Sequence, residues 1–147
     1  MFCNVILNLN KQYAHIKAII DTGNFLKDPI TKTPVIVIEK QALVNLVPKC
    51  ILHNIDKIIN GEEIELGDYI SKIRLIPFTS LGRENGILLG IRADSVFIEI
   101  EERNIVVENI IIGVYNGILN REGKYSALVG LDLVDRMEDV GLSIASS

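Results

Sequence analysis

The stretch IKAIIDTG, residues 16–23, decides how this chain is interpreted. Its first five residues are mostly apolar and predict a buried strand, and Asp21 follows directly, where the strand gives way to a Thr-Gly turn. Gly23 allows the φ values and the close backbone approach of a tight turn. An Asp at the end of a buried strand is held rigidly, and such preorganisation is what a catalytic carboxylate needs.

The triplet Asp21-Thr22-Gly23 occurs once in the 147 residues. Two carboxylates about 3 Å apart cannot both ionise and share one proton. The ionised member can take a proton from water while the protonated member polarises a peptide carbonyl. Such a pair can hydrolyse a peptide bond without a metal or a cofactor. A chain with one triplet is therefore expected to act as a symmetric homodimer in which each subunit contributes Asp21.

A three-residue string also arises by chance, as an Asp that caps a turn, and three features of its surroundings favour the catalytic interpretation. The apolar strand lies directly before it. An apolar-apolar-Gly element, residues 128–130, follows much later and leads into a helix predicted at residues 131–140. A β-hairpin with a glycine-bearing tip lies between the two.

Short β segments make up most of the remaining chain, and turn signals separate them. Strands at this spacing predict a mainly β fold, closed or sandwich-like, in a single domain of residues 1–147. The predicted strands cover residues 5–9, 13–20, 35–38, 73–78, 87–91, 96–100, 105–114 and 126–129.

Residues 39–60 differ, because their apolar side chains recur at helical spacings with Pro48 as a break. This pattern predicts a helical insertion between strands. Its apolar face is expected to pack against the core, with the binding of a partner as the alternative.

Composition and charge exclude several classes of protein. A net charge of −4 and the lack of a basic cluster argue against a nucleic-acid partner. Cys3 and Cys50 lie in no metal-binding spacing and are expected to be reduced thiols, and the two histidines are far apart, so no metal site is expected. No apolar run reaches the length of about 18 residues that could span a bilayer, so the chain is expected to be soluble.

Longer strings carry a resemblance to a known family. They are IDTGNFLKDPIT (residues 20–31) with PV (34–35), IPFTSLG (76–82) and ENGILL (84–89). Together they resemble the sporulation sigma-E factor processing peptidases of endospore-forming bacteria, the stage II sporulation protein GA family. The order of the D-T-G strand, the hairpin and ALVGLDLV (127–134) is similar to that of a retropepsin subunit.

This resemblance implies a retropepsin-like acid-protease barrel subunit, with a helical insertion and a C-terminal helix. The activity it implies is that of an aspartic endopeptidase that activates the precursor of a sporulation sigma factor, pro-sigma-E, by cutting off an N-terminal segment. Asp21 matches the catalytic Asp of the family, and Thr22, Gly23 and Asn24 form the supporting loop.

Two further elements follow from the resemblance. Leu128, Val129 and Gly130 match the segment that crosses beneath the D-T-G loop, called the psi-loop element here. The candidate flap is the hairpin of residues 78–91, and its predicted tip residues are Ser80, Leu81, Gly82, Arg83 and Gly86.

The resemblance also implies partners and a location. The partners are a second copy of the chain, the sigma-E precursor as substrate and an activating signalling protein, with no nucleic acid and no cofactor. In that family an N-terminal region of transmembrane helices precedes a cytoplasmic protease domain. The full-length protein is therefore expected in the cell membrane, and this chain is expected to be the cytoplasmic domain without its membrane-anchoring region.

Two departures from the retropepsin pattern stand out. Asn24 occupies the place of a small apolar residue, and the helical insertion lengthens the stretch between Gly23 and the flap. Asp28, which precedes Pro29, is interpreted as a turn residue. The alternative function is a non-catalytic interaction or regulatory domain on an acid-protease scaffold, in which Asp21 would not face its mate.

Overall fold

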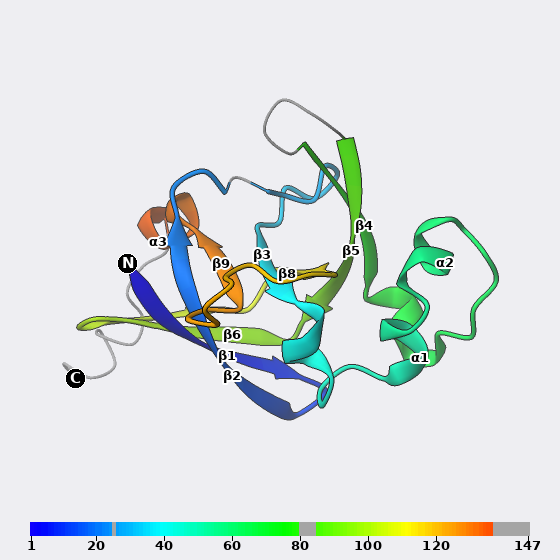
Figure 1. Ribbon diagram of the computed structural model, residues 1–147, viewed down its shortest axis with the longest axis horizontal. Coiled ribbons are helices and arrows are strands. Elements are labelled where there is room, and N and C mark those ends of the chain that lie inside the picture. The colour runs from blue at the N-terminus through cyan, green and yellow to red at the C-terminus, as the bar shows by residue number, and fades with distance from the viewer. Residues whose placement is uncertain (25, 80–84, 137–147) are drawn as a thin grey trace.

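The computed structural model describes residues 1–24, 26–79 and 85–136, and across them nine strands form one sheet (Figure 1). The strand order is β4-β5-β8-β3-β9-β2-β1-β6-β7. The bounds are Phe2–Leu9 (β1), Gln12–Asp21 (β2), Val35–Glu39 (β3), Ile73–Thr79 (β4), Asn85–Ala93 (β5), Ser95–Ile100 (β6), Arg103–Val107 (β7), Ile110–Tyr115 (β8) and Ala127–Gly130 (β9). The mainly β fold predicted from the sequence is confirmed.

The first hairpin shows how the sequence specifies the strands. In β1, Val5 and Leu7 are buried, while Asn4, which lies between two buried residues, is exposed. This is the alternation of a strand with one face on the core. The turn to β2 consists of Asn10 and Lys11, with φ of 53° and 63°. Two residues of positive φ form the tight turn that matches the twist of paired strands.

Short helices fill the segment between β3 and β4 (Figure 1). They are the 3₁₀ helices η1 (Lys40–Leu43) and η2 (Gly67–Ser71) and the α-helices α1 (Lys49–Leu52) and α2 (Ile55–Ile59). Their buried apolar side chains join the main core, and they include Leu43, Ile51, Leu52, Ile55 and Ile58. The helical insertion and its packing against the core are confirmed, whereas η2 was not predicted.

The predicted strand at residues 105–114 is wrong as a single element. The chain forms β7 and β8 there, and the exposed polar residues Glu108 and Asn109 separate them. β7 pairs with β6 at one end of the sheet, and β8 lies between β5 and β3. The polar pair Glu108 and Asn109 marks this break, but the apolar residues on both sides of it have the same β-rich composition, so composition alone predicts one strand.

The two faces of the sheet carry different apolar clusters. Consecutive residues of a strand point to opposite faces, so Ile36 and Ile38 belong to the main core while Val35 and Val37 belong to a smaller cluster on the other face. Half-buried side chains surround this second cluster, and they are Leu26, Phe78, Tyr115, Leu119 and Leu128. The second face is therefore only partly covered.

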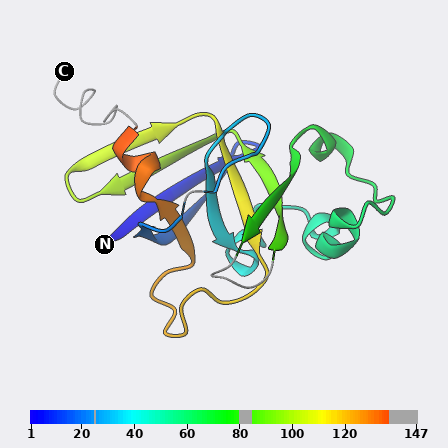
Figure 2. The same ribbon diagram turned by 90° about the horizontal axis from the view of Figure 1, so that it is seen from above.

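The chain turns into the helix α3 (Leu131–Arg136) directly after β9 (Figure 2). This confirms the predicted C-terminal helix over those residues, and the predicted remainder, residues 137–140, lies outside the described part. Within the described residues, no helix combines the length and the apolar character needed to cross a membrane. Cys3 is buried, Cys50 is exposed, and both are free thiols.

Candidate active site

Asp21 is the last residue of β2, as the sequence predicts. Its Oδ1 accepts a hydrogen bond of 3.0 Å from the backbone N–H of Gly23, and its carbonyl accepts one of 3.2 Å from the N–H of Asn24. Asp21 is partly exposed, and Thr22 and Gly23 are exposed. The turn therefore holds the carboxylate in place and leaves it open to a ligand.

The psi-loop element supports this turn through strand pairing and a side-chain hydrogen bond. β9 pairs with β2 in parallel, with Leu128 opposite Ile19 and Gly130 opposite Asp21. The side-chain amide of the buried Asn24 donates to the carbonyl of Leu128 over 3.5 Å, and its Oδ1 accepts from the N–H of Leu26 at 3.2 Å. The structure thus brings together seven predicted residues: Asp21, Thr22, Gly23, Asn24, Leu128, Val129 and Gly130.

Gly130 is the tightest point of this arrangement. A Cβ atom on Gly130 would lie 2.5 Å from the backbone oxygen of Asn24, so an Ala there must displace the loop. We expect Gly130→Ala to lower the free energy of unfolding by about 1–3 kcal/mol, measured in urea.

Gly23→Ala is the matched control in the same loop. Among the described residues its Cβ would meet only Oδ1 of Asp21, at an ordinary contact of 3.5 Å, so the unfolding free energy of this variant should stay near that of the wild type. Equal losses in the two variants would contradict a clash specific to Gly130.

The strand register also shows which face presents Asp21. Paired residues share a face, so Asp21 lies on the same face as Gly130 and, through Leu128, on that of Val37. This is the face of the second apolar cluster. The carboxylate therefore adjoins a partly covered apolar surface.

The hairpin predicted as the candidate flap is present at its base. β4 and β5 pair from Ile73 opposite Ile91 to Thr79 opposite Asn85, and Thr79 Oγ1 lies 3.0 Å from Asn85 Oδ1. Gly86 lies opposite Phe78, whose ring occupies the space that a Cβ on Gly86 would need. The other predicted tip residues lie outside the described part of the chain: Ser80, Leu81, Gly82 and Arg83.

Asp28 has contacts that the sequence did not reveal. It forms the predicted turn, since its Oδ1 accepts from the N–H of Ile30 at 2.9 Å, yet it is only 4% exposed. Its Oδ2 also lies 3.8 Å from Nε of Arg74 on β4. The hydrogen bond from Ile30, assisted by Thr31 and Arg74, lowers the pKa of Asp28 below its usual 3.8, although burial acts in the opposite direction.

This lowered pKa predicts how stability depends on pH. The folded Asp28 carboxyl binds a proton less readily than the unfolded one, so its contribution is complete above about pH 4 and is lost as the pH falls through the folded pKa. We expect Asp28→Asn to be less stable than the wild type by about 1 kcal/mol at pH 7, because the amide keeps the bond to Ile30 but loses the charge. Urea unfolding between pH 7 and 3 should show the gap between the two stabilities narrow towards the acidic end, whereas a constant gap would contradict this assignment.

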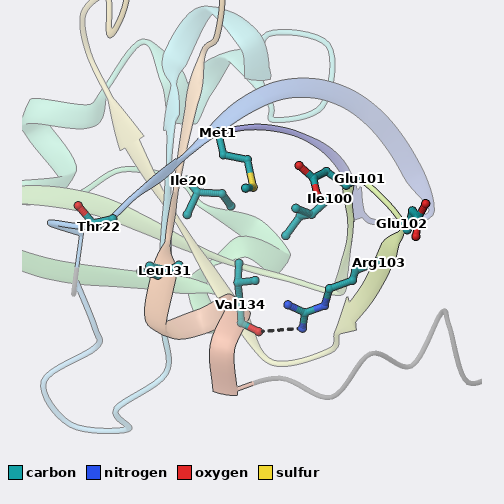
Figure 3. A pocket seen from close by; sticks show the side chains of 9 residues that line it. All are labelled: Met1, Ile20, Thr22, Ile100, Glu101, Glu102, Arg103, Leu131 and Val134. Carbon is teal, nitrogen blue, oxygen red and sulfur yellow. Dashed lines mark hydrogen bonds between the residues drawn. The ribbon is translucent and has the colours of Figure 1, made fainter.

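A cavity of about 750 Å³ lies beside the turn that follows Asp21 (Figure 3). Met1, Ile20, Ile100 and Val134 point into it, and Thr22 lies at its edge. Its lining also includes Glu101, Glu102, Arg103 and Leu131, and Nη2 of Arg103 donates to the carbonyl of Val134 over 3.4 Å. Ile20 and Asp21 are consecutive in β2 and face opposite ways, so this cavity lies behind the carboxylate and not in front of it.

Comparison with known proteins adds independent findings. The model of a family described as sporulation factor SpoIIGA matches residues 1–133. A sporulation sigma-E factor-processing peptidase of Priestia megaterium is 31% identical over 134 residues, which are 89% of this chain and 43% of that protein. A protein of the same name from Bacillus subtilis is 32% identical over 130 residues, 86% of this chain and 42% of that protein.

A third relative, from Bacillus thuringiensis subsp. kurstaki, is 33% identical over 127 residues, 85% of this chain and 79% of that protein. The chain thus spans less than half the length of the first two relatives. No solved structure matches it.

Proposed function

The chain belongs to the sporulation factor SpoIIGA family, and from this we propose that it is an aspartic endopeptidase that cuts the precursor of a sporulation sigma factor, pro-sigma-E. The observation that carries the proposal is the support of Asp21 at the end of β2 by the psi-loop element. The names of the relatives from Priestia megaterium and Bacillus subtilis support the choice of substrate.

The proposed catalyst is a dyad of two Asp21 side chains, one from each subunit of a homodimer. The single D-T-G triplet of the chain supports this, because one chain supplies one such carboxylate. A two-fold axis beside the exposed residues Thr22 and Gly23 would bring the two turns together, as in a retropepsin. The two carboxyl groups would then share one proton.

The chemistry follows from that shared proton. The ionised Asp21 takes a proton from water while the water oxygen bonds to the peptide carbon, and the protonated Asp21 of the partner subunit polarises the carbonyl oxygen. The C–N bond then breaks as the leaving amine takes up a proton. One proton remains on the pair at the end of the cycle.

The substrate would lie across the face that presents Asp21. Its second apolar cluster, with the half-buried Leu26, Phe78 and Leu128, offers contacts to a peptide segment, and the β4–β5 hairpin is the candidate flap. The proposal also includes an activating protein partner. It places this domain in the cytoplasm, attached to the cell membrane through residues outside this chain.

The direct test is co-expression of the chain with pro-sigma-E in a bacterium that does not sporulate. The proposal expects a shortened sigma factor whose new N-terminus, read by mass spectrometry, reports one cut. A parallel experiment fuses the chain to a parallel coiled-coil dimer, so that weak association cannot hide activity. An intact precursor with both forms of the folded chain would refute the proposal.

A further inference from the structure

The loop after the catalytic turn is a small, closed hairpin. Lys27 and Pro34 form a β-bridge, and the N–H of Val35 donates to the carbonyl of Leu26 at 3.0 Å. Across the hairpin the N–H of Asp28 donates to the carbonyl of Thr33 at 2.9 Å. The loop therefore moves as one piece, and the catalytic turn is joined directly to it through Asn24.

A buried carboxylate lies in this hairpin. The Asp28 side chain is 5% exposed, and Arg74 is the cation that the described structure places within ion-pair distance of it. A carboxylate buried without such a partner and without hydrogen bonds would be costly. The pair is therefore a constraint on where the hairpin can lie.

Arg74 is itself fixed in position. Its Nη1 donates to the carbonyls of Ser71 and Ile73, both at 2.9 Å, which anchors the side chain at the beginning of β4. Arg74 also lies on the sheet face that presents Asp21, because it pairs with Gly90, which pairs with Gly113, which pairs with Val37. The ion pair thus spans from the catalytic loop to the hairpin that forms the candidate flap.

A second contact joins the same two parts. Leu26 and Phe78 are both half-buried and pack against one apolar cluster, Leu26 from the loop and Phe78 from β4. The loop and β4 are consequently related in two ways, through one ion pair and through one shared apolar cluster.

We propose that Asp28 is a positioning residue, which through Arg74 holds the catalytic turn and the β4–β5 hairpin in a fixed relative position. The ion pair transmits the position of β4 to the loop, and the loop transmits it to the turn at Asp21. The effect on cleavage rests on the proposed function, whereas the effect on the turn does not.

The test removes the charge of Arg74. This residue is partly exposed, so its substitution should disturb folding less than substitution of the buried Asp28. In Arg74→Gln, hydrogen exchange of the Gly23 and Asn24 amides should become about tenfold faster, because their hydrogen bonds to Asp21 are less well held. The matched control is Arg92→Gln, an exposed arginine of β5 with no ion pair among the described residues, and it should leave these amides unchanged.

One further variant and one further readout make the result decisive. The double variant Asp28→Asn/Arg74→Gln should exchange no faster than the faster single variant, because both changes break one link. In the cleavage assay Arg74→Gln should lower kcat about tenfold with a smaller change in KM.

Exchange at Gly23 and Asn24 that matches the control, or effects that add fully in the double variant, would overturn the proposal. Faster exchange combined with no cleavage by the wild-type chain would refute the proposed function and leave the positioning role of Asp28 supported.

Discussion

Asp21→Asn is expected to remain folded and to cut pro-sigma-E at least about a thousandfold more slowly than the wild type. An amide can neither take a proton from water nor donate one in place of a carboxylic acid. The substitution acts on both members of the proposed dyad at once, because both come from the same gene. Folding should survive, since the Asn side-chain oxygen can still accept the hydrogen bond from the N–H of Gly23.

The measurement is the initial rate of cleavage, with the unfolding free energy of each variant determined beside it. Asp68→Asn is the control, because Asp68 is an exposed carboxylate in η2 with no side-chain hydrogen bond or ion pair in the described structure. It should cleave at the wild-type rate. A folded Asp21→Asn chain with full activity would sink the aspartic mechanism and favour a different role for this scaffold, such as an interaction domain.

Mixing subunits is expected to give the second large effect. A threefold excess of Asp21→Asn chains should reduce the activity of a fixed amount of wild-type chain to about one quarter, when pairing is random and the total concentration exceeds the dimer dissociation constant. Each wild-type chain would then find a wild-type partner in about one encounter of four. Mixed dimers contain one carboxylate and lack the shared proton.

Two controls accompany the mixing experiment. A threefold excess of an unrelated protein should leave the wild-type rate unchanged. When the wild type alone is diluted below the dissociation constant of the dimer, the cleavage rate per chain should fall. A rate that ignores the Asp21→Asn chains, and that stays proportional to wild-type concentration on dilution, would mean that one chain carries a complete site.

The turn that follows Asp21 could be predicted because its signals are local. The apolar run before Asp21 and the glycine after it specify a strand and a turn from neighbouring residues alone. The position of the psi-loop element required the resemblance, since no local pattern says that β9 pairs with β2. The structure shows the turn after β2 and the pairing of β9 with β2.

Other features depend on tertiary contacts and could not be predicted. Asp28 and Arg74 lie far apart in sequence, and an ion pair between them exists only once β4 packs beside the loop. The division between β7 and β8 was missed although Glu108 and Asn109 interrupt the apolar residues there, because the pairing of the two strands at different places in the sheet decides that the chain turns at this pair. The short helix η2 contributes one buried side chain, Tyr69, which is too few to give a helical period.

The pairing of Gly130 with Asp21 also has a consequence for biosynthesis. The two residues are 109 positions apart, and β9 is the last strand of the described chain. Contacts of such high sequence separation form late and slowly during folding. A nascent chain on the ribosome therefore carries Asp21 without the strand that supports it until the 109 positions up to Gly130 have been added, and we expect no proteolytic competence before β9 has emerged and docked.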